Sequence, residues 1–489
     1  MSAVASSEAL IVLAILLPFV GALLIPLFRH HPNLRETVTL VTAALLCFVV
    51  FSLLEPVLAG ARPEVHVLDV AQGLTLAFKV EPLGMLFALV ASTLWIVNSI
   101  YSIGYMRANK EPRQTGFYVC FAIALGSTIG IAFAKNLFTL FLCYEALTIA
   151  TYPLVVHNAN AEAFRAGRVY LMLLLGTSLV LFLPAIVATW VIAGTLDFTP
   201  GGILAGKAGP AVTGILLALF VFGIGKAAVM PLHFWLPAAM VAPTPVSALL
   251  HAVAVVKAGV FTLLKVVVLI FGVDTLSALG QSGWLTAVAG ATIVIASVVA
   301  LKQDNLKRRL AYSTVSQLSY IVLGAAILAP ISVAGAAIYI AAHAVSKITL
   351  FFAAGSIYTA SHLTEVSQLD GIGRRMPWTM GAFAIGALGM IGIPPTANFL
   401  GKWFILGGAM QTANWLAVSI IIVSTVLNAA YFLPIVYRAF FCAPAAHAHD
   451  YGEAPWPIVL ALTMTASATI LMFVWPDIPF ALAKLLSDR

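Results

Sequence analysis

The stretch GIGKAAVMPLHFWLPAAMVAPTPVSALLHAVAVVKAGVFTLLK, residues 223–265, is strongly apolar and yet carries several ionisable side chains. Each such side chain costs roughly 2.5–3.5 kcal/mol inside hydrocarbon on insertion scales. A chain that keeps several of them in one apolar stretch is expected to use them. Two prolines, Pro231 and Pro237, interrupt its middle. The ionisable residues are Lys226, His233, His251, Lys257 and Lys265.

The composition of the whole chain is that of a membrane protein. Of its 489 residues, 62% are hydrophobic and only 9% are charged, against about 25% charged in soluble domains. Repeated apolar runs of about 20 residues indicate helices that cross a bilayer. We therefore expect an all-α polytopic membrane protein with one membrane domain, residues 1–489, embedded in lipid. The net charge of +7 does not indicate a nucleic-acid partner.

Fourteen spans are predicted. The first run lacks a basic segment before it and is too long for the core of a signal peptide, so it is interpreted as a span. No connection is long enough for a soluble domain. The predicted spans cover residues 9–28, 37–58, 80–104, 115–134, 137–156, 167–194, 212–237, 246–271, 283–301, 310–328, 332–358, 378–409, 414–440 and 455–475.

Lysines and arginines divide unevenly between the loops on the two sides of these spans. One set of loops holds 14 of the 25 and the other holds 6, and the remaining five are lysines within spans. The inner side of a membrane carries the excess of positive loops. The pattern therefore places both termini on the outer side of a bacterial-type plasma (inner) membrane.

Interrupted spans recur in the two halves of the chain. Pro231 and Pro237 lie in span 7, and Pro394 and Pro395 lie in span 12, about 160 residues later. Breaks at matching places in two halves are typical of inverted repeats with a site near the midplane. We expect two five-helix repeats, 115–271 and 283–440, between spans 1–3 (9–104) and span 14 (455–475).

Glu145 is the acidic residue that lies in the middle of an apolar run, whereas Glu55 and Glu81 lie near span ends and are expected to reach the interface. A carboxylate in hydrocarbon takes up a proton or finds a cation. Lys226, at the middle of span 7, is the expected partner of Glu145. Making or breaking that contact would switch the lysine between holding and releasing a proton. The alternative for Glu145 is a packing role, with hydrogen bonds to Tyr144 or Thr148.

Further ionisable residues lie on other spans. Lys257 is at the middle of span 8, whereas Lys265 is near its outer end, where a long side chain is expected to snorkel to the interface. His343 and Lys347 are four residues apart and share a helix face, and Lys402 follows the double proline. His251 and His233 are relay candidates, or hydrogen-bonding core residues. A row of such groups would form a lateral proton wire.

No metal or cofactor site is expected. The four cysteines form no CxxC pair, and three lie in apolar runs as small buried residues. There is no GxGxxG after a strand and no paired-histidine haem pattern beyond chance. The chain is thus expected to lack a redox site of its own, and a redox role would come from partner subunits.

Five stretches resemble the antiporter-like proton-translocating family shared by respiratory complex I, membrane-bound hydrogenases and Mrp-type cation/proton antiporters. That family has fourteen helices, two inverted five-helix repeats and broken helices at spans 7 and 12. The resemblance covers roughly residues 80–440. Its motifs are FLCYEALTIATYPL (141–154), GKAAVMPLHFWLPAAMVAPTPVSALLHAVAVVKAG (225–259), DNLKRRLAYSTVSQLSYIVLG (304–324), HAVSKITLFFAAGSI (343–357) and GIPPTANFLGKW (392–403).

The resemblance implies proton-transfer roles for specific residues. Glu145 matches the glutamate of span 5 and Lys226 its lysine partner, while Lys257 matches the bridging lysine of span 8. Lys402 matches the terminal ionisable position of span 12, where one complex I paralogue has glutamate and the D component of Mrp antiporters has lysine. The central relay positions match His251, His343 and Lys347.

The expected function is therefore that of a proton-translocating subunit within a complex of integral membrane subunits. Mrp-type antiport of protons against Na⁺ or K⁺ is favoured. The alternatives are a proton-pumping membrane subunit of a complex I-like NADH:quinone oxidoreductase or membrane-bound hydrogenase, and the membrane partner of a two-component inorganic-carbon uptake complex. A self-sufficient cation antiporter ranks lower, because such carriers use carboxylate clusters to hold a dehydrated ion.

Overall fold

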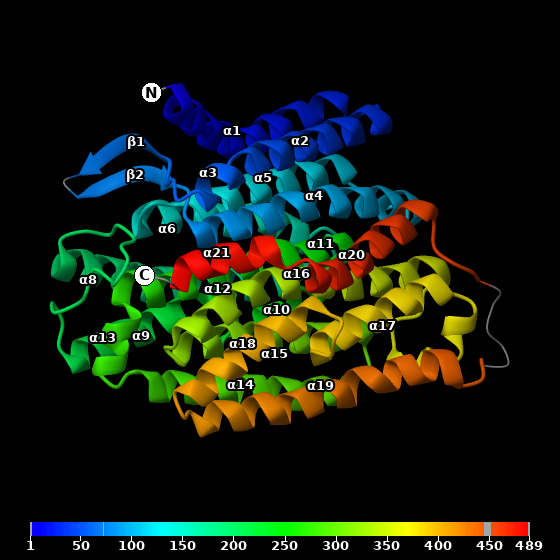
Figure 1. Ribbon diagram of the computed structural model, residues 1–489. Helices are drawn as coiled ribbons and strands as arrows, with labels where there is room; N and C mark the ends of the chain where they lie inside the picture. The colour runs from blue at the N-terminus through cyan, green and yellow to red at the C-terminus, as the bar shows by residue number, and fades with distance from the viewer. Residues whose placement is uncertain (1, 72, 445–450, 488–489) are drawn as a thin grey trace.

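The computed structural model describes residues 2–71, 73–444 and 451–487, and almost all of them lie in helices or short connections (Figure 1). The elements of the first half are α1 (Ser2–Leu24), α2 (Pro32–Ser52), α3 (Leu54–Leu58), β1 (Glu64–Ala71), β2 (Leu74–Lys79), α4 (Pro82–Ala108), α5 (Gln114–Phe133), α6 (Leu137–Val155), α7 (Ala161–Thr177), α8 (Leu183–Ala193), α9 (Pro210–Gly223), α10 (Trp235–Ala238), α11 (Thr244–Ala248) and α12 (Val255–Val266).

The second half continues with longer helices. They are α13 (Val273–Ala278), α14 (Ser282–Lys302), α15 (Leu306–Ala326), α16 (Pro330–Ser361), α17 (Pro377–Ile391), α18 (Ala397–Gln411), α19 (Trp415–Phe441), α20 (Trp456–Val474) and α21 (Asp477–Ser487).

Within the described ranges, eleven helices are long and apolar enough to cross a membrane. They correspond to eleven of the fourteen predicted spans. The other three predicted spans are not continuous apolar helices of this kind. One is divided into α9 and α10 and another into α17 and α18, while the third, α15, is rich in Ser, Thr, Gln and Tyr. A multi-pass helical membrane protein is thus confirmed, while the count of fourteen and the inverted repeats stay predictions.

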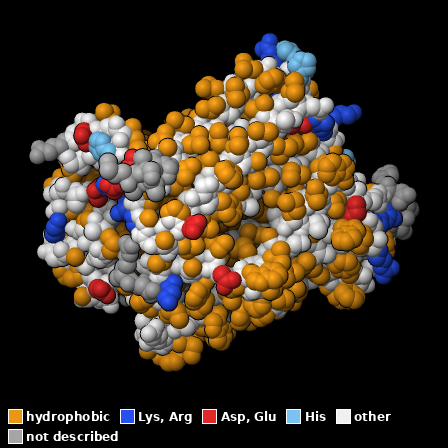
Figure 2. Space-filling view, turned by 45° about the horizontal axis from the view of Figure 1, so that its top comes forward, with side chains coloured by type: hydrophobic (Ala, Val, Ile, Leu, Met, Phe, Trp, Pro, Cys, Tyr) orange, Lys and Arg blue, Asp and Glu red, His pale blue; other side chains and the backbone are white. Residues whose placement is uncertain are grey.

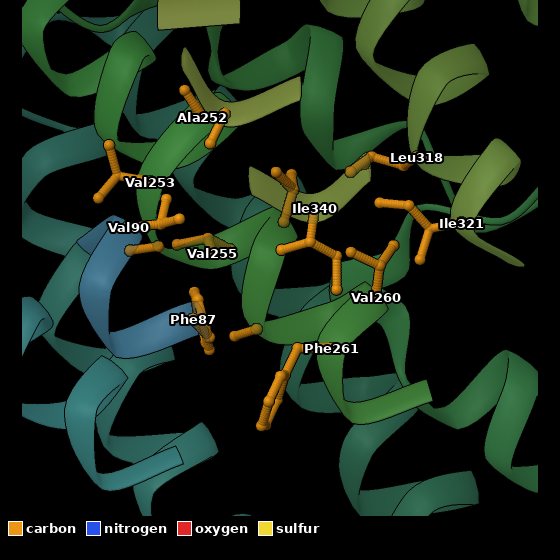
Figure 3. Close-up of a cluster of buried hydrophobic side chains, with 14 of the residues drawn as sticks. Phe87, Val90, Ala252, Val253, Val255, Val260, Phe261, Leu318, Ile321 and Ile340 are labelled. Carbon is orange, nitrogen blue, oxygen red and sulfur yellow. The ribbon is translucent and has the colours of Figure 1, made fainter. Parts of the chain in front are cut away.

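Two helical segments occupy the centre of the bundle. In Thr244–Phe271 and in α16, every residue of the most apolar 18-residue window is buried. α16 packs against α4, α11, α12, α15, α17 and α18. Figure 3 shows part of this core, where Phe261 faces Phe87 of α4 and Ile340 faces the α15 side chains Leu318 and Ile321. The ionisable residues of the central segments are therefore held in a packed apolar interior.

The outer surface agrees with a lipid environment. Figure 2 shows hydrophobic side chains over most of one face, with charged groups mainly near its margins. Large apolar side chains such as Leu23, Met172 and Val191 are about three-quarters exposed. Soluble proteins rarely present apolar surface on this scale, whereas a bilayer covers it.

The chain is mostly helical, as expected, but the segment between α3 and α4 departs from the all-α expectation. This segment contains a β-hairpin, in which Glu64 of β1 pairs with Lys79 of β2 in antiparallel register. Gly73 adopts a φ of +80° near the turn, a conformation that suits glycine. An ion pair of 3.1 Å between Glu64 and Lys135 fastens the hairpin to the bundle. The alternation of apolar and polar residues in this segment is a pattern typical of β-strands.

The bundle has two distinct ends. The hairpin end carries β1 and β2, and α1 begins and α21 ends there (Figure 1). The connection 194–209 also lies at this end, since Phe198 N bonds to Lys135 O and Leu204 N bonds to Ile270 O. At the opposite end, the basic end, α4 ends and α15 begins. The predicted lysine- and arginine-rich loops lie at the basic end.

Two predicted helix breaks are present. Between α9 and α10 the chain leaves regular helix at residues 224–234, with Pro231 inside the break and Pro237 just after it, in α10. Gly259 of α12 lies against this break, because a Cβ there would be 2.2 Å from the Lys226 carbonyl carbon. The second break, residues 392–396, separates α17 from α18 and contains Pro394 and Pro395.

Candidate proton-transfer site

Lys226 lies in the first helix break and contacts α6. Its ammonium donates hydrogen bonds to the Tyr144 carbonyl at 2.8 Å and to Thr148 Oγ1 at 2.6 Å. The same nitrogen lies 3.1 Å from the centroid of the Tyr144 ring, and the backbone N–H of Lys226 donates to the Tyr144 hydroxyl. A buried ammonium is stabilised by such hydrogen bonds and by the face of an aromatic ring.

Glu145 follows Tyr144, but its carboxylate does not contact Lys226. Both carboxylate oxygens are buried, and neither has a hydrogen-bond partner among the described residues. Among the described residues, no ion pair within 4 Å joins Glu145 to Lys226. The structure thus brings Lys226 to α6 beside the carboxylate without closing the predicted pair. Tyr144 and Thr148 were the alternative hydrogen-bond partners expected for Glu145. They are bonded to Lys226 and not to the Glu145 carboxylate.

Lys257 and His343 form the contact between the two central segments. The distance from Lys257 Nζ on α12 to His343 Nδ1 on α16 is 2.5 Å, and both side chains are fully buried. His251, earlier on the same segment, packs its ring 4.9 Å from Phe351 of α16. Neither ring nitrogen of His251 has a partner within the described chain, and buried polar atoms of this kind usually bind water.

Lys347 begins a hydrogen-bonded path toward the second helix break. Its ammonium donates to Ser313 Oγ at 2.9 Å, and the Tyr431 hydroxyl oxygen lies 3.1 Å from the same oxygen. The Tyr431 hydroxyl also bonds to the Asn428 side-chain oxygen. Asn428 Nδ2 in turn lies 3.4 Å from the carbonyl oxygen of Met390, at the end of α17.

Lys402 binds the carbonyls that the second break sets free. Its ammonium donates to Met390 O at 2.8 Å and to Ile391 O at 3.0 Å, and it lies 4.6 Å from the Tyr320 ring centroid. Gly392, with a φ of +87°, makes room for the lysine, since a Cβ there would be 2.8 Å from the Lys402 chain. An interrupted helix can expose carbonyls inside protein where they line a polar cavity.

A second path reaches the same carbonyl. Gln317 Nε2 donates to Met390 O at 3.2 Å, and the Tyr339 hydroxyl donates to the Gln317 side-chain oxygen. The Tyr339 ring stacks near His343, with 6.1 Å between ring centroids. Met390 O therefore accepts from Lys402, Gln317 and Asn428.

Sequence reasoning missed the neutral members of these paths. Ser313, Gln317 and Tyr320 follow the spacing i, i+4, i+7 along α15, which places them on one helix face. That polar stripe in an otherwise membrane-embedded helix was the available signal. Tyr339, Asn428 and Tyr431 are single polar residues in apolar helices and gave no comparable pattern.

Lys265 does not snorkel, and Glu81 does not reach the interface. Lys265 is fully buried, with its Nζ 3.1 Å from Glu81 Oε2 and 2.8 Å from the Ala134 carbonyl. Glu81 is 7% exposed. Both expectations were wrong because the connection around Phe198 folds over this helix end. His233, the other accessory candidate, packs its ring against Phe234 at 4.2 Å.

Two of the cavities at the basic end border residues 237–244. One of about 710 Å³ is bordered by Pro237, Arg165 and Arg308. The other, of about 240 Å³, is bordered by Glu111 and Lys307 and extends to Thr244 at the start of α11. Burial raises the pKa of Glu111, and the nearby Lys307 ammonium partly opposes that shift. Both cavities lead from charged rims toward the helix segments that carry the buried lysines.

The described residues contain no cluster of three or more His, Cys, Asp and Glu side chains that could hold a metal ion. The groups assembled here are lysines, histidines, hydroxyls and amides. Lysine ammonium groups only donate hydrogen bonds, whereas imidazole, hydroxyl and amide groups both donate and accept them.

Comparison with known proteins places the chain among proton-translocating membrane subunits. The profile of the family described as NADH:quinone oxidoreductase/Mrp antiporter, TM, matches residues 134–428. The N component of the NADH-quinone oxidoreductase of Desulforudis audaxviator is 32% identical over 74% of this chain and 72% of its own length. The D component of the Na(+)/H(+) antiporter of Alkalihalophilus pseudofirmus is 26% identical over 88% of this chain and 87% of its own length.

A solved structure shares the whole architecture. A chain of the membrane-bound sulfane sulfur reductase, an archaeal respiratory membrane complex, superposes with a TM-score of 0.86 at 25% identity, covering 98% of this chain and 97% of that chain. Lys226, Lys257, His343 and Lys347 all lie within the segment matched by the family profile. The chain belongs to the NADH:quinone oxidoreductase/Mrp antiporter family of membrane subunits.

Proposed function

We propose that the chain moves protons through the membrane domain of a multi-subunit complex, along a row of buried ionisable groups on successive helices. Water and neutral hydrogen-bonding side chains would connect the members of this row. They are, in order, Glu145, Lys226, His251, Lys257, His343, Lys347 and Lys402.

The contact between Lys257 and His343 carries this proposal. It joins α12, in the first predicted repeat, to α16, in the second, through two titratable nitrogens at 2.5 Å. From α16, the two paths through Ser313 and through Gln317 end on the Met390 carbonyl that binds Lys402. The Met390 carbonyl only accepts hydrogen bonds and cannot itself pass a proton on, so the polar groups of the two paths would hold the water that carries the proton to Lys402.

Uptake is proposed at the basic end, where the cavities of about 710 Å³ and about 240 Å³ open. The cavity beside Glu111 and Lys307 reaches Thr244, seven residues before His251 on the same segment. The cavity at Pro237 lies beside the break that holds Lys226. With the basic end on the inner side of the membrane, as the positive-inside rule requires, the row would draw protons from the cytoplasmic side.

Glu145 would control loading of Lys226. In the present geometry the ammonium binds Tyr144 and Thr148, and the carboxylate one residue away has no hydrogen bond to a described group. Closure of the pair would follow a rotation of one of the two side chains. Because a Glu–Lys contact at 4 Å is worth about 4 kcal/mol at an effective dielectric of 20, closure would hold the proton on the lysine.

Partner subunits would supply the driving force. Mrp-type antiport of protons against Na⁺ or K⁺ is supported by Lys402 and by the similarity to the D component of a Na(+)/H(+) antiporter over nearly its whole length. A redox-driven complex is the second candidate, supported by the higher identity to the quinone oxidoreductase component and by the sulfane sulfur reductase superposition. In both, other integral membrane subunits are the partners.

Transport by the assembled complex in sealed vesicles tests the proposal. Lys226→Ala and Glu145→Ala should each abolish proton-coupled transport while the complex still assembles. Full transport in both variants would overturn the proposal. Replacing Na⁺ with K⁺ or choline during the assay would then separate cation-coupled from redox-driven operation.

A further inference from the structure

A second buried titratable pair lies outside the proposed row. Lys265 Nζ, in the last turn of α12, is 3.1 Å from Glu81 Oε2, just before α4. Both groups are buried, and the two atoms are at ion-pair distance. The ammonium also donates to Ala134 O. The pair is therefore close enough to exchange a proton.

A cavity connects this pair to the surface at the hairpin end. It has a volume of about 80 Å³ and is bordered by Glu81, Gly201, Val268 and Asp274. Glu81 is buried, whereas Asp274, in the first turn of α13, is exposed. Since a water takes about 30 Å³ of liquid volume, the cavity has room for a short water chain between the two carboxylates.

The helix that carries Lys265 also carries the centre of the proposed row. Lys265 follows Lys257 by eight residues, which is about 12 Å along the axis at 1.5 Å per residue. Between them lies Thr262, whose hydroxyl is buried without a partner in the described chain. Because buried hydroxyls are normally satisfied, this orphan group indicates a water position between the two lysines.

Two phenylalanine rings pack together beside the part of α12 that lies between the two lysines. Phe261 of α12 packs against Phe87 of α4 with ring centroids 5.0 Å apart, and both are buried (Figure 3). The Phe261 ring centroid is 5.8 Å from Lys265 Nζ. This apolar contact lies next to Thr262, and it would keep water out of the interval until one ring moves.

We propose that the Glu81–Lys265 pair is a second proton-release site, which discharges the first half of the row at the hairpin end. This inference rests on the proposed function and adds a branch to it. When the Phe87–Phe261 contact opens, water would carry a proton from Lys257 toward Lys265.

The proton balance of the release step is simple. A Lys265 N–H bond breaks and a Glu81 O–H bond forms, which converts the ion pair into a neutral amine and a neutral acid. The Glu81 O–H then passes its proton to cavity water and on past Asp274 to the solvent. The neutral Lys265 is recharged by the next proton from Lys257, and no other reactant is needed.

The branch is tested by proton translocation in sealed vesicles that contain the whole complex. Glu81→Gln should lower the rate severalfold, and Glu81→Gln combined with Lys402→Ala should lower it well beyond either change alone, because two release routes are lost. Asp69→Asn, an exposed carboxylate of the hairpin outside the cavity, is the matched control and should leave the rate unchanged.

A structural role of the pair gives a different result. The double variant Glu81→Gln/Lys265→Met removes the buried charges together, so it avoids an uncompensated ion. A rate restored to that of the unaltered complex in this variant would show that the pair only supports folding and would overturn the release site. A rate that stays low in a complex of normal thermal stability supports it.

The apolar contact gives an independent measurement. Phe261→Ala should raise passive proton leakage of the vesicles severalfold, whereas Leu264→Ala, a truncation on the same helix, should not. Equal leakage in the two variants would overturn the gate.

If Lys226→Ala leaves translocation intact, the proposed function fails and the branch fails with it. If Lys226→Ala abolishes translocation and Glu81→Gln changes nothing in either background, the branch alone fails.

Discussion

Lys257 Nζ and His343 Nδ1 lie 2.5 Å apart in the middle of the bundle. The lysine comes from α12 and the histidine from α16, 86 residues later. Both helices are buried along their whole apolar windows, so neither side chain can reach lipid or solvent. Any proton that either nitrogen gains or loses would therefore pass to the other nitrogen or to internal water.

We expect the loss of this contact to separate uptake from release at Lys402. Lys257→Ala should lower proton translocation at least tenfold, about 1.4 kcal/mol of added barrier, because both release routes pass through it. His343→Ala should lower the rate severalfold, because the branch through Lys265 remains. The double variant should be no slower than the worse single variant, since both groups act in one step. Rates that multiply in the double variant would contradict this.

The pattern of charges in apolar sequence predicted much of the site. Lys226, Lys257 and Lys402 stand out because a lysine within a membrane span is costly in free energy. The prolines at the two breaks can be read directly from the sequence. These signals are local in the sequence. They identified the breaks that the structure shows, and they identified the lysines that lie in or against them.

Contacts between distant helices were beyond such reasoning. Whether Lys265 reaches the interface or pairs with Glu81 depends on how the connection through Phe198 covers the helix end. Likewise, Gln317 reaches the second helix break only because it bonds to Met390 O, 73 residues later. The hairpin was missed because its short alternating strands lie between two long apolar runs, and only the apolar runs were assigned a structure.

The two paths that end on Met390 O should act in parallel. Gln317→Leu interrupts one path and Asn428→Leu interrupts the other, while Lys402 keeps both of its own carbonyl contacts. Each single variant should lose only a few-fold in translocation rate, since the other path remains, and the double variant should lose far more than the product of the two. This is measured as initial rates in sealed vesicles.

The matched control for the parallel paths is Ser356→Ala. Ser356 is a buried hydroxyl on α16 that bonds to Thr379, outside both paths. It should leave the rate unchanged alone and in combination with Gln317→Leu. A double variant of Gln317→Leu and Asn428→Leu that is no slower than either single variant would show one serial path.

Gly259 should be needed for the geometry of the first break. A methyl group there would come within 2.2 Å of the Lys226 carbonyl carbon, which is backbone and cannot move aside cheaply. Gly259→Ala should destabilise the protein on the order of 1–3 kcal/mol by overpacking and displace Lys226. Gly381→Ala, where a Cβ meets nothing within 4 Å, is the control. Thermal unfolding in detergent should show a lower Tm for the first variant only.

Glu111 gives a pH dependence whose sign is fixed by its surroundings. Burial raises its pKa, with the nearby Lys307 opposing, so ionised Glu111 destabilises the fold at pH above that raised value, and protonation at lower pH removes the penalty. Glu111→Gln should therefore have a higher Tm than the unaltered protein at pH 8. The difference should shrink as pH falls toward about 4.3, the ordinary glutamate value.

Glu8→Gln, at an exposed position, should show no such trend. A difference for Glu111→Gln that stays constant from pH 8 to pH 4, or that grows toward acid, would contradict the buried, charge-penalised carboxylate.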